Sequence, residues 1–145
     1  MATINLLDWW DDAWKEGLWY AAWPKAIQGL TPQQAAWTPA PGRKSIWEIL
    51  SHMSFWREQS LRVIAGDPPS KEETAKRNFQ APTEVTPAAW QAARDRFAEL
   101  QKQIRVVIVD PAGDVSRLQY MIPHDSYHMG QIMYLRALQG LPPIE

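Results

Sequence analysis

The chain has 145 residues, 46% of them apolar and 21% charged, and a formal net charge of −1, so we expect one globular domain over residues 1–145. The composition excludes nucleic acid as a main partner, because phosphate binding needs a basic face, and it excludes a membrane span, because no segment has the roughly 20 apolar residues required. Cysteine is absent, so a metal must be held by histidine or carboxylate groups, and thiol chemistry needs a thiol from a substrate.

The first predicted helix covers residues 3–30. Its apolar residues recur at spacings of three and four and form one stripe: Leu7, Trp10, Trp14, Leu18 and Ala21. More aromatic residues lie on a second side, which indicates contact with another chain or with packed loops: Trp9, Trp19, Tyr20 and Trp23. Pro24 is expected to end or kink this helix. After it, Thr31 and Pro32 have the form of a helix start and predict a short helical turn.

The second and third helices have clear start signals. Ser45 is a good N-cap for the second helix, and Glu48 stands where a capping box needs an acid. This helix should end near residues 66–69, before a polar crossover over residues 67–84 in which Ser70 can start one short helix. Thr86, followed by a proline, starts the third helix, which ends at residues 110–113.

The fourth predicted helix covers residues 115–139. Pro123 lies within it, so the helix either bends there or starts later than its apolar pattern suggests. Four amphipathic helices with few strand signals predict an all-α protein, and a four-helix bundle is the natural way to bury their apolar faces.

All three histidines of the chain lie on two of these helices. His124 and His128 are four residues apart, so they share a face of the fourth helix, and that face continues into the interior. His52 lies on the core side of the second helix. Three neutral imidazoles with an open fourth position form a catalytic type of zinc site, and imidazole also suits nickel. The alternative is a set of hydrogen-bonded core histidines without metal, but three inward-facing histidines favour a divalent metal site.

Several neighbouring residues are candidates for supporting roles. The spacing of His124 and His128 invites comparison with the zinc-protease motif H-E-x-x-H, in which the acid is a general base. Asp125 stands in place of that acid but is one methylene shorter, so we interpret it as a residue behind the ligands or at the surface. Gln131 can orient a ligand or contact a substrate. Asp125 and Gln131 are therefore the catalytic candidates, whereas for Glu48 we favour the helix cap.

Two further residues are noted for this site. Gly130, inside the fourth helix, indicates either a close helix contact or space for a substrate. In the protease comparison, the spacing would leave Glu145 as an acidic third ligand.

Four segments of the chain resemble the DinB/YfiT-like superfamily: residues 30–32 (LTP), 37–42 (WTPAPG), 45–53 (SIWEILSHM) and 124–132 (HDSYHMGQI). The resemblance covers nearly the whole chain in order. It implies a four-helix bundle in an up-down-down-up arrangement and a divalent metal held by His52, His124 and His128. It also implies a homodimer, which would give the second aromatic side of the first helix a use.

The resemblance leaves three classes of function open. Characterised members of the superfamily include metal-dependent transferases that use low-molecular-weight thiols, so our best hypothesis is a thiol-dependent S-transferase acting on a small molecule. The alternatives are a metal-dependent hydrolase and a non-catalytic dimeric stress or binding protein with a structural metal. We expect a cytoplasmic location, because the first 12 residues carry acid where a secretory signal carries base.

Overall fold

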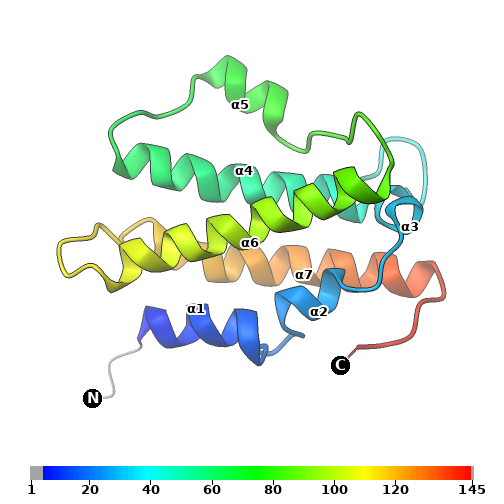
Figure 1. Cartoon of the computed structure of the whole chain (residues 1–145), viewed down its shortest axis with the longest axis horizontal. Helices are drawn as coiled ribbons and strands as arrows, with labels where there is room; N and C mark the ends of the chain where they lie inside the picture. The colour runs from blue at the N-terminus through cyan, green and yellow to red at the C-terminus, as the bar shows by residue number, and fades with distance from the viewer. Residues whose placement is uncertain (1–4, 145) are drawn as a thin grey trace.

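The computed structural model describes residues 5–144 of the chain. These residues form helices and loops, in the order α1 (Leu6–Lys15), α2 (Trp23–Ile27), α3 (Pro32–Ala36), α4 (Ile46–Ile64), α5 (Lys71–Arg77), α6 (Pro87–Val109), the 3-10 turn η1 (Leu118–Tyr120) and α7 (Met121–Leu138). The predicted all-α class is confirmed for this part of the chain. Helix α4 packs against both α6 and α7, and α1 packs against α6. In Figure 1, α1 and α7 run in one direction across the view and α4 and α6 in the other.

The prediction of one long helix over residues 3–30 is wrong, because the chain divides this region into α1 and α2. It turns at Gly17, whose φ of +89° is left-handed, and a Cβ atom there would overlap the carbonyl oxygen of Tyr20. Pro24 does not end a helix. It lies in the first turn of α2, where a missing N–H costs nothing. The expected start at Thr3 lies outside the described residues.

The predicted N-caps are confirmed at the start of four helices: Thr31 (α3), Ser45 (α4), Ser70 (α5) and Thr86 (α6). At α4 the capping box is complete. The Ser45 N–H donates to Glu48 Oε2 over 3.0 Å, and the Glu48 N–H donates to Ser45 Oγ over 3.1 Å. The cap role favoured for Glu48 is thus confirmed, and it fixes the start of the helix that carries His52.

Helix α7 begins later than residue 115, after the η1 turn. Pro123 is its third residue, so this proline lies in the first turn, where backbone N–H groups have no intrahelical partner. Of the two possibilities that the sequence left open, the later start is therefore correct.

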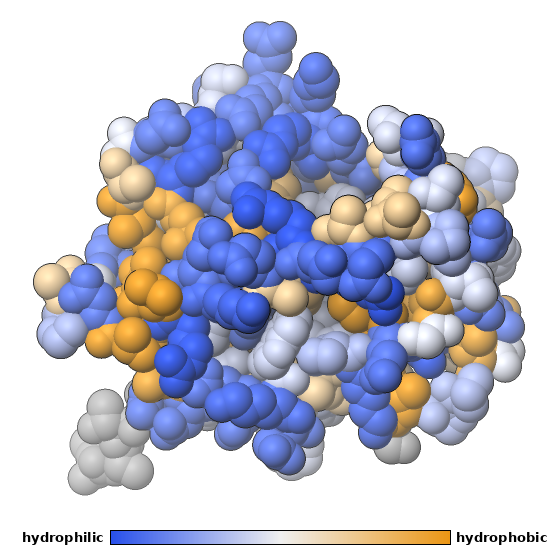
Figure 2. All heavy atoms as spheres, in the orientation of Figure 1, coloured by the Kyte–Doolittle hydropathy of each residue, from blue (hydrophilic) through white to orange (hydrophobic). Residues whose placement is uncertain are grey.

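The hydrophobic core lies between α4, α6 and α7 and is closed by α2 and α3. Its largest fully buried apolar side chains come from these helices and from α1: Trp10, Trp23, Trp90 and Phe97. In contrast to the core, the surface at α5 is hydrophilic. Figure 2 shows mainly hydrophilic residues at the top of the view, where Figure 1 places that helix. Over residues 5–144, none of the helices combines the length and the apolar character that a membrane crossing needs.

Candidate metal centre

Helices α4 and α7 bring the three predicted histidines together. His52 projects from α4 towards His124 and His128 on α7, and one ligand atom from each ring lies within 4.8 Å of the others. The ring centroids are 4.5 to 5.1 Å apart. Because α4 and α7 pack directly against each other, three imidazoles from distant parts of the sequence share one point.

Two amide side chains fix the protons on these rings. Nδ1 of His52 lies 2.5 Å from Oδ1 of Asn78, and Nδ1 of His128 lies 2.7 Å from Oε1 of Gln131. An amide oxygen only accepts, so each Nδ1–H donates and each Nε2 keeps its lone pair. Nε2 of His52 lies 3.1 Å from Nε2 of His124, close to the roughly 3.3 Å between two ligands of a tetrahedral zinc ion. The donor set therefore fits a metal ion.

The third ring, His124, differs from the other two. Its Nδ1 atom is buried and, within residues 5–144, has no hydrogen-bond partner, since Oδ1 of Asp125 is 3.7 Å away. Its side chain is 27% exposed, whereas His52 is 7% and His128 3% exposed. A fourth ligand can therefore approach the three nitrogens from the His124 side.

Burial lowers the pKa of two of the three imidazoles, His52 and His128. It lowers the pKa of His52 to about 4, with a smaller lowering from His128 and His124 and an opposing effect of the hydrogen bond with Asn78. Burial also lowers the pKa of His128, partly opposed by its hydrogen bond with Gln131. Because a metal ion binds the unprotonated ring, both histidines are ready to bind at neutral pH.

Phe79 covers one face of the site. Its ring stacks on the His52 imidazole with a centroid distance of 3.8 Å and an angle of 12° between the planes. Phe79 has a φ of +55°, which is rare for a residue with a large side chain and costs free energy. Asn78 and Phe79 could not be identified from the sequence, because they lie in a polar crossover without a periodic pattern. The only signal was the asparagine at the end of a short predicted helix.

Asp125 is not at the surface and does not face the shared point of the histidines. It is 1% exposed and accepts two hydrogen bonds from the guanidinium of the fully buried Arg57, over 2.5 and 3.1 Å. Arg57 also donates to Gln101 and lies 4.4 Å from the ring centroid of Phe97. Both carboxylate oxygens of Asp125 are thus engaged, so the comparison with a protease base is not supported. The residue ties α7 to α4.

Gln131 accepts a hydrogen bond from His128 Nδ1, the contact that one of its two predicted roles requires. Among residues 5–144, no atom outside the local helix backbone lies within 4 Å of the place where a Cβ of Gly130 would stand, so close packing by these residues does not explain the glycine. Glu145, the acidic ligand of the protease comparison, lies outside the described residues.

The fold and the site define a helical protein with three converging imidazoles. The family model of the DinB superfamily matches residues 18–132, a stretch that includes His52, His124 and His128. The chain belongs to the DinB superfamily. Comparisons with curated proteins and with solved structures gave no significant match.

Proposed function

We propose that this protein binds one divalent metal ion, zinc or nickel, through Nε2 of His52, His124 and His128 and uses it as an enzyme acting on a small molecule. The observation that carries the proposal is the pair of amide acceptors, Asn78 and Gln131. They hold the ring protons on Nδ1 of His52 and of His128, which leaves both Nε2 atoms free to bind a metal. Three protein ligands leave a fourth position for water or a substrate, as in catalytic rather than structural zinc sites.

We also infer that residues 1–145 form one domain in which α1, α4, α6 and α7 make the up-down-down-up four-helix bundle implied by the resemblance. The two pairs of helix directions in Figure 1 support this arrangement, and so do the contacts of α4 with α6 and α7. The long crossover that includes α5 lets α4 and α6 run in the same direction.

Among the reactions open to such a site, we favour S-transfer from a low-molecular-weight thiol. A metal held by these histidines would lower the pKa of a bound thiol, whose proton would pass to solvent. The thiolate would then displace a leaving group such as chloride from an electrophilic carbon, with no need for a protein base. Metal-dependent hydrolysis commonly uses a base on the metal-bound water. The two acids nearest to the histidines in the sequence are engaged elsewhere, Asp125 by Arg57 and Glu48 by Ser45 and Lys44.

The test is the conjugation of a thiol to a small electrophile such as a chlorodinitrobenzene. Zinc-loaded and nickel-loaded protein, purified without a histidine tag, is assayed with glutathione, bacillithiol and mycothiol. We expect at least one thiol to react faster than in buffer with the same metal, and His128→Ala to remove the gain. If every thiol reacts at the buffer rate, the transferase proposal is wrong.

The alternatives remain a hydrolase and a non-catalytic protein with a structural metal. Chelation separates the structural role from the two enzymes, because removal of a structural metal unfolds a protein that depends on it. The extensive apolar core supports a bundle that stays folded without metal. A fall in Tm of more than about 20 °C on chelation would favour the structural role over ours.

We further propose a homodimer that forms through the exposed aromatic residues of α1 and of the turn that follows it. Trp9 is 44% exposed and Trp19 is fully exposed. Both line an open, mainly apolar groove of about 1330 Å³, whose other wall includes Met129 and Gly130 of α7. Exposed apolar surface of this extent is typical of interfaces. Light scattering should give twice the chain mass, and Trp19→Ser should shift the protein to monomer; a wild-type monomer at all concentrations would exclude the dimer.

A further inference from the structure

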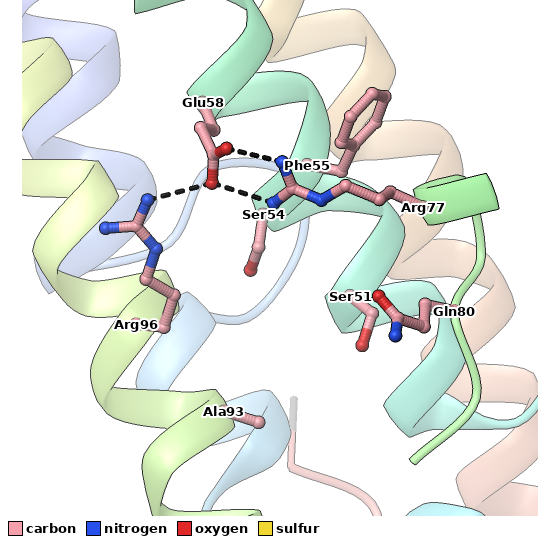
Figure 3. A pocket seen from close by; sticks show the side chains of 8 residues that line it. All are labelled: Ser51, Ser54, Phe55, Glu58, Arg77, Gln80, Ala93 and Arg96. Carbon is pink, nitrogen blue, oxygen red and sulfur yellow. Dashed lines mark hydrogen bonds and ion pairs between the residues drawn. The ribbon is translucent and has the colours of Figure 1, made fainter. Parts of the chain in front are cut away.

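Helix α5 is held to the rest of the protein by ion pairs rather than by burial, since every one of its residues keeps exposure to solvent. Arg77, its last residue, donates from its two terminal nitrogens to the two carboxylate oxygens of Glu58 on α4, over 2.6 and 3.0 Å. Glu58 also accepts from Arg96 of α6 over 2.9 Å. Figure 3 shows the Glu58 carboxylate between the two guanidinium groups, in a small pocket away from the histidines.

A second ion pair supports the same face of α5, one turn before Arg77. Arg62 of α4 donates to Glu73 of α5 over 2.7 Å, and Arg77 donates to the same Glu73 oxygen over 2.9 Å. The Arg77 guanidinium also lies 5.3 Å from the ring centroid of Phe55. The end of α5 is therefore fixed on α4 by a fork of two hydrogen bonds and by a cation–π contact.

The residues that contact the metal site follow this fixed point directly. Asn78 is the next residue after Arg77, and its side chain accepts the proton of His52 Nδ1. Phe79 comes after it and stacks on the same imidazole. A left-handed backbone at Phe79 persists only where surrounding contacts hold it. The ion pair of Arg77 with Glu58 is the nearest such contact to Phe79 in the sequence.

We propose that Glu58 and Arg77 are positioning residues for the metal ligand His52: their ion pair keeps Asn78 and Phe79 on the imidazole, so the proton stays on Nδ1 and the Nε2 lone pair faces the metal. The part of this proposal that concerns metal binding rests on the proposed function, whereas the position of the proton is a property of the metal-free protein. Hydrogen bonds from Arg77 and Arg96 lower the pKa of Glu58 to about 2 against the effect of burial, so the ion pair persists wherever the histidines are neutral.

The chain contains a matched control. Arg105 of α6 also makes a two-bond fork, with Asp11 of α1, through Nε and one terminal nitrogen over 2.7 and 2.9 Å, at a place away from the histidines. Replacing Arg105 by glutamine breaks a two-bond ion pair of similar length between two helices. Any general effect on stability should therefore appear in Arg105→Gln as well as in Glu58→Gln, and only an effect on the site should separate them.

The first measurement is the nitrogen-15 spectrum of the imidazoles in metal-free protein at pH 8. The wild type should show His52 as a single tautomer with its proton on Nδ1. Glu58→Gln and Arg77→Gln should show a mixture of the two tautomers, as should Asn78→Ala, which removes the acceptor itself. Arg105→Gln should match the wild type. If Glu58→Gln and Arg77→Gln, folded by circular dichroism, keep the single tautomer, the positioning role is refuted.

The second measurement is zinc affinity by competition with a chelating dye. Loss of a group that supports a ligand costs about 10-fold or more in metal affinity, so we expect about 10-fold weaker binding in Glu58→Gln and Arg77→Gln and less than about 2-fold in Arg105→Gln. If Glu58→Gln and the wild type bind zinc with equal affinity, the positioning role is overturned, whereas the proposed metal site is not. A wild type that binds neither zinc nor nickel overturns the proposed function instead, and the tautomers then decide the positioning role alone.

Discussion

Replacement of Asp125 by asparagine should destabilise the protein by about 3 kcal/mol. Arg57 is 0% and Asp125 1% exposed, so the variant leaves a guanidinium charge in the core without its counter-charge. Breaking such a buried pair costs about 3 to 5 kcal/mol, and the lower end applies because the amide oxygen still accepts one hydrogen bond. The loss is large against the roughly 5 to 15 kcal/mol that stabilise a typical domain.

The assay is urea unfolding of metal-free protein at pH 7, followed by circular dichroism, with Asp114→Asn as the control. Asp114 is exposed and caps only a local turn, so its variant should change the free energy of unfolding by less than about 0.5 kcal/mol. The double variant Arg57→Met with Asp125→Leu should recover most of the loss, because an apolar pair of similar volume removes the buried charge. A loss below about 1 kcal/mol in Asp125→Asn would refute the reasoning.

Three further outcomes are expected. The ion pairs of Glu58 lower its pKa from 4.5 to about 2, so its contribution of about 1 kcal/mol is present above pH 4.5 and is lost as the pH falls through about 2. Urea unfolding of wild type and Glu58→Gln should therefore differ at pH 7 and converge near pH 2. Because burial lowers the pKa of His52 from 6.5 to about 4, the metal-free protein should lose stability as the pH falls from 6.5 to 4. Urea unfolding across this pH range should show a smaller loss of stability in His52→Gln than in the wild type. An equal loss in both proteins would contradict this prediction. Gln131→Ala should weaken zinc binding about 10-fold in a dye competition, and an unchanged affinity would exclude its role in orienting His128.

The features that the sequence predicted well depend on short spacings. Ser45 and Glu48 form a capping box over three residues, and His124 and His128 meet on one helix because they are four apart. Such patterns depend only on residues that are close in the sequence, so they can be recognised without the tertiary structure. The place of His52 could be predicted to the level of a helix face, since its apolar neighbours define that face.

The features that could not be predicted join distant segments. Arg57 and Asp125 are 68 residues apart, and neither one alone indicates its partner. The break after α1 was missed because the apolar spacing continues through Gly17, and only the close approach of the Tyr20 carbonyl shows why the chain turns there. Asn78 reaches His52 through a crossover that buries little, so no hydrophobic pattern reports its position.

Metal analysis of protein purified without a histidine tag tests the central claim most directly. After dialysis against zinc and then against buffer, mass spectrometry of the elements should find one zinc ion per chain. His52→Ala and His128→Ala, shown to be folded by circular dichroism, should retain almost none. A wild-type chain without zinc or nickel, or variants that hold as much metal as the wild type, would contradict a metal site formed by these three imidazoles.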